Sequence, residues 1–349
     1  MSKSFFPLFF LPLLGFGCIN VDSTASTEGG LWLSADAGET WTSTSLMPTV
    51  SGVKSFSSAD MSVIVFDAAD PDAMYAGTME DGMLYSYDNG TSWEQPTETS
   101  LREGRVRGIA VDPRDKCTIY VALSSRVMKS TDCNRTYDTE TFVEGSSKIV
   151  RALELDWYAP DTVWIGTSSG DVLKSTNGGD TWTTVVRVGD GVTDVMVDGS
   201  DSRIVLVTTE DKGIWRTADG GTEWTELEEE LKEFKNAEEG YQFAQNSDGI
   251  MMYYASAYGL LRSTDHGATW SALTLVTASN SVRVWSLAVN PDNGNEIFYG
   301  TSTTFYNTTD GGENWATNEL PSDRAATALA IDPDSTSSIF LGVARIEED

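Results

Sequence analysis

The sequence predicts an all-β protein, a seven-bladed β-propeller with four antiparallel strands in each blade. Three observations support this prediction. An eight-residue pattern recurs seven times, short strand-like segments separated by turn residues fill the intervals, and each end of the chain carries half of a repeating unit. Self-similarity at a period of 42 to 52 residues is typical of propellers and solenoids.

The repeated octapeptide, called the box below, begins with Ser or Thr and ends with an aromatic residue. An acid at its third position can accept hydrogen bonds from the amides of a tight turn. Glycine at the fifth position allows a positive φ, and the ring at the eighth can pack between neighbouring units. The third and eighth positions are Asp36 and Trp41, Asp88 and Trp93, Asp132 and Tyr137, Asn177 and Trp182, Asp219 and Trp224, Asp265 and Trp270, and Asp310 and Trp315.

The exceptions within the boxes agree with this interpretation. Asn134 replaces glycine in the third box and tolerates the left-handed region better than most residues. Tyr137 keeps an aromatic ring, and Asn177 can still accept through its amide oxygen. The boxes are therefore expected to be structural.

Each box lies inside a unit of four predicted strands. An inner strand ends near Asp-Pro, as in residues 105–113, and a second strand follows, as in 118–123. A third strand leads into the box, as in 171–176, and the box turns the chain into a fourth. Four short antiparallel strands make one blade.

The ends of the chain predict how the ring closes. Residues 31–45 offer only a third and a fourth strand, and residues 325–346 offer only a first and a second. Together they complete the seventh blade, which removes the exposed sheet edges of an open ring.

The first 17 residues are predicted to be a signal peptide. Lys3 precedes an apolar run that is too short to span a bilayer and contains two prolines. Cys18 follows as at lipoprotein cleavage sites, although Gly15 stands where such sites favour Leu. We expect either lipidation of Cys18 or cleavage nearby and release, then a flexible polar linker over 18–30 and the propeller over 31–349.

Cys117 and Cys133 are predicted to form a disulfide. They flank two strand-like segments around a turn, and counting outward from it places Cys117 opposite Asp132, beside Cys133. A bridge closing so short a loop contributes on the order of 3 kcal/mol and needs an oxidising compartment. Alternatively, the two are unrelated buried thiols.

The net charge of −30 disfavours nucleic acid and anionic membranes as partners. It also fits a simple solvated acidic surface. His266, the single histidine, occupies a variable place in a box, which excludes a multi-histidine metal site and a Ser-His-Asp triad. We expect a monomer without cofactors, in which only paired carboxylates or a Tyr–Glu arrangement could catalyse.

A cluster of arginines is the candidate binding site. Five arginines lie at or just before the starts of predicted inner strands, which line the channel. When these strands are aligned, Trp285 occupies the same position as Arg107 and Arg151. We expect a basic pocket that binds a carboxylate or an acidic peptide through forked hydrogen bonds. Alternatively, the arginines pair with channel acids such as Asp194 and Glu154. The proposed ligand-binding residues are Arg105, Arg107, Arg151, Arg283, Trp285 and Arg324.

Two further segments are candidates for contact with a partner. Residues 226–240 predict an amphipathic helix over the channel mouth, with Leu227, Leu231 and Phe234 on one face, or else a solvated helix without a role. Trp157 and Tyr158 lie in a loop on the box side, where they could stack on a sugar or serve core packing.

The seven boxes resemble the Asp-box, or bacterial neuraminidase, repeat family over about residues 31–346. The resemblance implies a propeller and a structural box, and it says little about function. Relatives include sialidases, xyloglucan-active glycosidases, sortilin-type receptors and photosystem assembly factors. Sialidases carry a Phe/Tyr-Arg-Ile-Pro segment that this sequence lacks, and xyloglucan hydrolases pair two propellers around a cleft. The single seven-bladed, exported assembly factors match best in architecture, and they bind another protein.

We therefore expect a non-catalytic, exported binding scaffold at the cell envelope, with a protein or glycan of the cell surface as its partner. The alternative is a glycan-binding protein or a glycoside hydrolase of the sialidase or xyloglucanase type. A structural surface-layer role is the third possibility.

Overall fold

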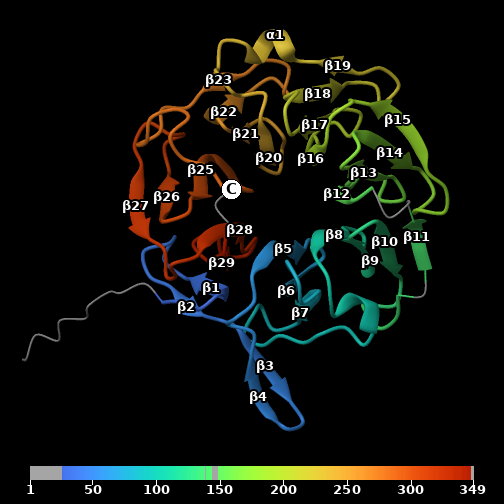
Figure 1. Cartoon of the computed structure of the whole chain (residues 1–349), viewed down its shortest axis with the longest axis vertical. Coiled ribbons are helices and arrows are strands. Elements are labelled where there is room, and N and C mark those ends of the chain that lie inside the picture. The colour runs from blue at the N-terminus through green and yellow to red at the C-terminus, as the bar shows by residue number, and fades with distance from the viewer. Residues whose placement is uncertain (1–25, 138, 144–147, 347–349) are drawn as a thin grey trace, which may run out of the picture.

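The computed structural model is a ring of seven blades around a central channel (Figure 1). The structure describes residues 26–137, 139–143 and 148–346. The inner strand of each blade packs against the inner strands of both neighbours, so the ring is closed. The predicted fold class and the predicted number of blades are confirmed.

The blades are numbered in chain order, with the inner strand first. Blade 1 contains β5 (Met61–Asp67), β6 (Asp70–Thr78) and β7 (Met83–Ser86). Blade 2 contains β8 (Val106–Asp112), β9 (Asp115–Leu123), β10 (Arg126–Ser130) and β11 (Thr139–Val143). Blade 3 contains β12 (Val150–Leu155), β13 (Val163–Thr167), β14 (Asp171–Ser175) and β15 (Thr183–Arg187). Blade 4 contains β16 (Val192–Val197), β17 (Val205–Thr209), β18 (Ile214–Thr217) and β19 (Thr225–Glu226).

The remaining blades follow the same order. Blade 5 contains β20 (Gly240–Gln245), β21 (Met252–Ser256), β22 (Gly259–Ser263) and β23 (Ser271–Ala272). Blade 6 contains β24 (Ser286–Asn290), β25 (Asn293–Gly300), β26 (Thr304–Thr308) and β27 (Ala316–Glu319). Blade 7 contains β28 (Ala325–Ile331), β29 (Ile339–Ala344), β1 (Gly30–Ser34) and β2 (Thr42–Ser43).

Blade 7 joins the two ends of the chain as predicted. Strand β1 pairs antiparallel with β29, with Trp32 opposite Leu341, so the N-terminal segment supplies the outer half of the blade. Contacts with the ring begin before residue 31. Ser26 donates its N–H to the Pro321 carbonyl at 3.2 Å, and Gly30 donates to Ala59 at 2.9 Å. Residues 1–25, with the predicted signal peptide and Cys18, lie outside the described residues.

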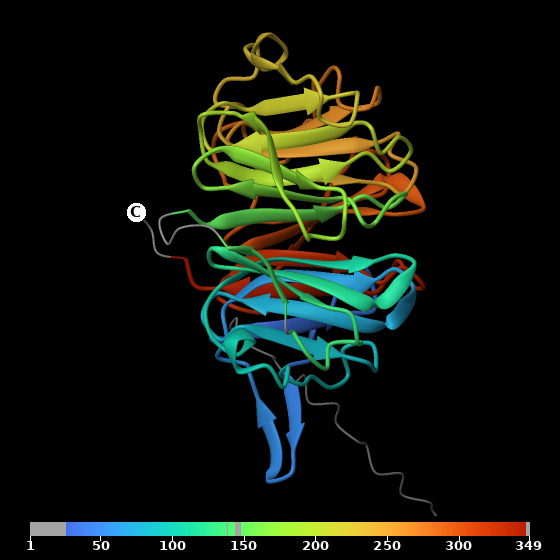
Figure 2. The same cartoon turned by 90° about the vertical axis from the view of Figure 1, so that its right-hand side faces the viewer.

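Blade 1 departs from the four-strand prediction. Its fourth strand is reduced to a bridge between Tyr85 and Glu94, and Pro96 follows, which has no N–H to continue a ladder. The long first interval between boxes holds an unpredicted hairpin, β3 (Leu46–Thr49) and β4 (Gly52–Ser55), which projects from the ring (Figures 1 and 2).

The boxes form the hydrogen-bonded turns that were predicted. Asp36 accepts from the Thr40 N–H at 2.8 Å and from the Ser34 hydroxyl at 2.7 Å, and Gly38 donates its N–H to that hydroxyl at 2.8 Å. The structure adds that the fourth box residue also has a positive φ, 58° at Ala37 and 60° at His266. Two consecutive left-handed residues therefore make each turn.

The aromatic residue that ends a box packs against the preceding blade. Trp224 lies edge-on to Trp164 of blade 3, with ring centroids 6.2 Å apart, and Trp41 lies edge-on to Phe305 of blade 6 at 5.2 Å. Neighbouring blades also approach each other closely at Gly166 of blade 3, where a Cβ would clash with Val192 of blade 4. The boxes thus hold neighbouring blades together.

The predicted disulfide between Cys117 and Cys133 is present. The Cys133 N–H also donates to the Cys117 carbonyl at 3.1 Å, because the box turn folds back onto the start of β9. Within the described residues, no helix is both long enough and apolar enough to cross a membrane.

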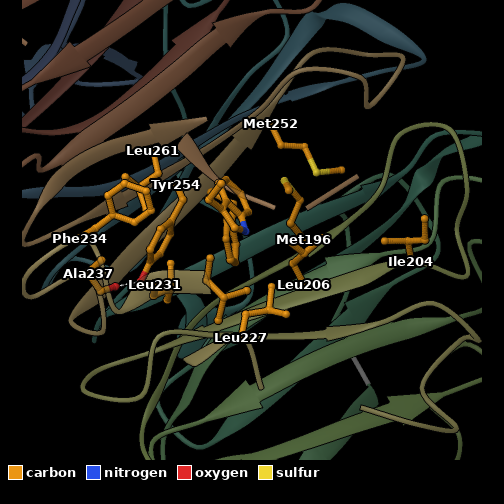
Figure 3. Close-up of a cluster of buried hydrophobic side chains, with 13 residues drawn as sticks. Met196, Ile204, Leu206, Leu227, Leu231, Phe234, Ala237, Met252, Tyr254 and Leu261 are labelled. Carbon is orange, nitrogen blue, oxygen red and sulfur yellow. Dashed lines mark hydrogen bonds between the residues drawn. The ribbon is translucent and has the colours of Figure 1, made fainter. Parts of the chain in front are cut away.

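The predicted helix over 226–240 is largely wrong. Helix α1 covers only Glu228–Leu231, and it lies at the outer rim of the ring instead of over the channel (Figure 1). The apolar residues were identified correctly: Leu227, Leu231 and Phe234 are buried in the cluster between blades 4 and 5 (Figure 3). Packing against this cluster pulls the segment outward. A short 3-10 helix, Thr99–Leu101, is the other helical turn described.

Candidate functional site

One irregularity recurs around the start of the inner strands. In six blades the register of the inner strand shifts by one residue near its beginning, which leaves that residue unpaired. In blade 6 the equivalent residue stands directly before β24. Such β-bulges re-aim side chains and are frequent beside functional sites. The seven residues, called the bulge ring below, are Ser62, Arg107, Arg151, Thr193, Tyr241, Trp285 and Thr327.

The bulge ring surrounds the mouth of the channel on the face opposite the boxes. A box follows the third strand of its blade, which runs parallel to the inner strand, so boxes lie where inner strands end. The seven bulge-ring residues all line a cavity of about 1470 Å³ at the other end. The mouth is therefore built from the same position of seven blades.

Three arginines gather on one side of this mouth. Arg107 and Arg151 are the bulge-ring residues of blades 2 and 3, and Arg105 stands two residues before Arg107. Arg151 forms an ion pair with Glu210. Among the described residues, neither Arg105 nor Arg107 has an ion pair or a hydrogen-bond partner for its side chain, and the Arg107 Nε is buried.

The positive charges of Arg105, Arg107 and Arg151 repel one another. Burial, followed by the charges of Arg105 and Arg151, lowers the pKa of Arg107 to about 10. Burial, followed by the charge of Arg151, also lowers the pKa of Arg105. The guanidinium groups repel one another in a partly desolvated place, and a bound anion would relieve that repulsion.

A fourth arginine stands across the mouth between two aromatic rings. The Arg283 guanidinium carbon lies 4.1 Å from the ring centroid of Tyr241 and 4.1 Å from that of Trp285. Tyr241 is fixed by its hydroxyl, which donates to Glu239 at 2.9 Å. These ring contacts hold the guanidinium group at the mouth while the residue as a whole stays exposed.

The predicted pairing of these arginines with Glu154 and Asp194 is not observed. Both acids line the channel below the mouth, and among the described residues no ion pair joins either acid to an arginine. Burial, followed by the charge of Asp194, raises the pKa of Glu154 to about 8. Burial raises the pKa of Asp194 to about 7, against hydrogen bonds from the Phe243 and Val195 amides. Glu210 is the acid that pairs instead.

Arg324 does not join the other predicted site residues. Its side chain is 8% exposed and bonds to Asp60 at 2.8 Å and to the Ser58 carbonyl at 3.1 Å. It ties the start of β28 to the segment before β5, across the junction of blades 7 and 1. Five of the six predicted residues line the mouth cavity, and Arg324 does not.

Tyr241 was missed by the sequence analysis. It occupies the column of Arg107, Arg151 and Trp285, so aligning all seven inner strands would have included it. Glu210 had no such signal, because it enters the site from the loop after β17.

The other end of the channel holds a smaller hollow. It has a volume of about 480 Å³ and is lined by Trp157, Gln245, Asn246 and others. Trp157 lies on the box side as predicted, 40% exposed, and its indole N–H donates to the Asp198 carbonyl of blade 4 at 2.7 Å. His266 Nδ1 lies 2.8 Å from a carboxylate oxygen of the fully buried Asp198, which links blades 4 and 5.

Comparison with known proteins finds the fold of this chain in other propellers. The chain matches no protein-family model. A xyloglucanase from a Paenibacillus species is 29% identical over an alignment of 164 positions, which covers 36% of this chain and 16% of that protein. The chain therefore spans a small part of this curated relative.

Three of the solved structures that share the fold are compared with the chain. The GH74 xyloglucanase from Xanthomonas campestris is 17% identical with a TM-score of 0.65, over 87% of this chain and 52% of its own. YCF48 bound to D1 peptide is 15% identical with a TM-score of 0.62, over 87% and 96%. The extracellular domain of the putative one component system BT4673 from B. thetaiotaomicron is 14% identical with a TM-score of 0.60, over 83% and 42%.

Fold and site together define a seven-bladed propeller whose channel mouth is lined by both arginines and acids, with the rings of Tyr241 and Trp285 among them. At these identities the likeness shows the fold alone. The chain covers nearly the whole length of YCF48 and about half of the GH74 enzyme.

Proposed function

We propose that this chain is a non-catalytic, exported binding propeller whose channel mouth receives an acidic group of a protein partner. The observation that carries the proposal is the cluster of Arg105, Arg107 and Arg151. In a chain with a net charge of −30, two of these three arginines have no acidic partner among the described residues. A carboxylate offers the matching acceptors for their N–H groups.

The surrounding features support the same proposal. A ring of seven blades presents a rigid face, so the site is organised before the ligand arrives. YCF48, which is similar in fold and length, is known bound to a peptide. The predicted signal peptide and the disulfide favour export, and we propose that Cys18 is lipidated or that cleavage releases the chain.

A calorimetric titration tests the proposal. The probe is the peptide acetyl-Gly-Ser-Gly-Asp-amide, and its Asn analogue is the neutral control. The wild type should bind the Asp peptide, more weakly as salt rises, and should not bind the Asn peptide. Arg107→Gln with Arg151→Gln should lower the affinity at least tenfold, since a charge-assisted hydrogen bond contributes about 1.5 to 3 kcal/mol.

Arg114→Gln is the matched control, because Arg114 is an exposed arginine at the turn after β8, away from the mouth. Equal affinity of the wild type and the double variant would remove the arginine cluster from the function. If the Asn peptide bound with the same affinity as the Asp peptide, the site would not recognise the negative charge of the carboxylate.

A glycan-binding or glycoside-hydrolysing function is the second candidate. It is favoured by the held, half-exposed ring of Trp157 beside a hollow with amide side chains, and by the partial match to a xyloglucanase. Glu154 and Asp194 are the carboxyl pair available for such chemistry. Turnover of xyloglucan oligosaccharides or sialyllactose, lost in Glu154→Gln, would reject the non-catalytic proposal.

A further inference from the structure

The bulge ring is not uniform, and its charged and aromatic members form two groups. Arg107 and Arg151 belong to the neighbouring blades 2 and 3 and, with Arg105, make up what is called the arginine anchor. Tyr241 and Trp285 belong to the neighbouring blades 5 and 6 and hold Arg283 between them, which is called the stacked anchor. In a ring of seven blades, these two groups lie on opposite sides of the mouth.

The bulge-ring residues between the anchors carry only hydroxyl groups. Ser62 donates to the Val106 carbonyl at 2.6 Å, and Thr327 donates to the Met61 carbonyl at 2.8 Å. These two hydroxyls tie blades 7, 1 and 2 together and hold no charge. Thr193 of blade 4 is the third.

Acidic side chains also line the mouth between the anchors. Glu210 and Asp211 enter from blade 4, and Asp60 and Glu80 enter from blade 1. Asp60 is held by Arg324 and Arg345. Glu239 also lines the mouth, held by the Tyr241 hydroxyl beside the stacked anchor, and Glu210 pairs with Arg151. Because these acids repel an anion, we expect the mouth to accept negative charge only where the unpaired arginines Arg105, Arg107 and Arg283 stand.

The stacked anchor can bind a carboxylate through the N–H groups of Arg283. The Arg283 guanidinium contacts two aromatic rings, and among the described residues Arg283 has no ion pair. These ring contacts restrict the exposed side chain before a ligand binds, which lowers the conformational entropy that binding would cost. Its N–H fork matches the two oxygens of one carboxylate.

We propose that the channel mouth recognises a peptide segment with two acidic groups, one held by the arginine anchor and the other by the stacked anchor. This proposal rests on the proposed function and specifies its ligand. The segment crosses the mouth, and its uncharged middle lies over the hydroxyl and acidic sectors. The second contact is intramolecular once the first has formed, so it raises affinity without a second association step.

The test compares two peptide series with the whole chain in calorimetric titrations. One series is acetyl-Asp-(Gly-Ser)-Asp-amide with one to four Gly-Ser repeats, and the other has Asn in place of the second Asp. At the best length, the two-acid peptide should bind at least tenfold more tightly than its one-acid partner. This gain in affinity should vanish for shorter peptides, because a linker that cannot span the distance between the two anchors does not allow both acids to bind at once.

Substitutions in the two anchors test whether each anchor binds one acidic group of the peptide. Arg107→Gln and Arg283→Gln should each lower the affinity of the two-acid peptide to about that of the one-acid peptide. Trp285→Leu should weaken two-acid binding while leaving the charge of Arg283 in place. Arg114→Gln should change nothing, and equal unfolding midpoints would show that all variants are folded.

Two results would overturn the inference, and they differ in what they leave standing. If both series bind equally and only Arg107→Gln weakens them, the stacked anchor has no role and the proposed function survives. If no peptide of either series binds to the wild type, the proposed function falls with the inference.

Discussion

At the scale of single residues, two channel acids work against the folded state at neutral pH. The pKa of Glu154 is raised from 4.5 to about 8, and that of Asp194 from 3.8 to about 7. A carboxyl whose pKa is raised on folding binds protons more tightly in the folded state. The contribution of these two groups to stability therefore falls as the pH rises from about 4 to about 8.

The substitution Glu154→Gln tests this effect, because it keeps the shape and removes the charge. Its free energy of unfolding in urea should exceed that of the wild type at pH 8.5 by on the order of 1 to 2 kcal/mol, with channel water reducing the full effect of the pKa shift. At pH 4 the two proteins should be alike. Glu103→Gln, at an exposed acid outside the channel, is the control. Equal destabilisation at both pH values would show that Glu154 acts through packing and not through its charge.

At the scale of elements, the residue directly before a box links one blade to the next. Lys129 donates from its ammonium group to the Gly178 carbonyl at 2.9 Å, and Lys174 donates to Gly220 at 2.9 Å. Arg216 makes the same contact with the His266 carbonyl, and Asn307 makes it with the Ala37 carbonyl of the first box, across the closed ring. Each accepting residue is the fourth of its box, and its left-handed backbone turns the carbonyl toward the preceding blade.

Lys174→Met should remove this link while keeping the apolar stem. The ammonium group also lies 4.7 Å from the Trp164 ring centroid, so a hydrogen bond and a cation–π contact are lost together. We expect the free energy of unfolding to fall by about 1 to 2 kcal/mol. Lys54→Met in the projecting hairpin should leave it unchanged. Equal urea midpoints for the two variants would contradict a role for the link.

At the scale of the whole molecule, closure of blade 7 determines whether the ring is a single stable body. Strand β1 pairs with β29 along its length, and Leu31 and Phe340 are buried in one cluster with residues of blade 1. Removing β28 and β29 would expose the paired edge of β1 and the inner face of blade 1. Such an edge invites pairing with other chains.

A chain ending at Arg324 should therefore aggregate or unfold at a temperature well below that of the full chain. A chain ending at Ile346 keeps every described strand and should match the full chain. Size-exclusion chromatography and thermal unfolding followed by circular dichroism give both readouts. A soluble monomer of the shorter chain with an unchanged melting temperature would show that blade 7 does not stabilise the ring.

The sequence by itself determined the features that arise from local chemistry repeated along the chain. The boxes, the four-strand units and the disulfide could be predicted, because turn acids, glycine and strand lengths act within about 45 residues. The shared seventh blade could be predicted because each end of the chain carries half of a unit. The place of Arg107, Arg151, Arg283 and Trp285 at the channel mouth followed from the same alignment.

Only the tertiary structure decided how side chains from different blades meet. In the folded chain, Arg283 contacts the rings of Tyr241 and Trp285, and Arg151 pairs with Glu210. Arg324 pairs with Asp60 instead of lining the mouth, and Leu231 is buried at the rim of the ring. Apart from Arg283 and Trp285, which are two residues apart, these partners lie on different blades, so no local pattern records them. The curvature of the closed ring sets which side chains can touch, and that curvature is a property of all seven blades at once.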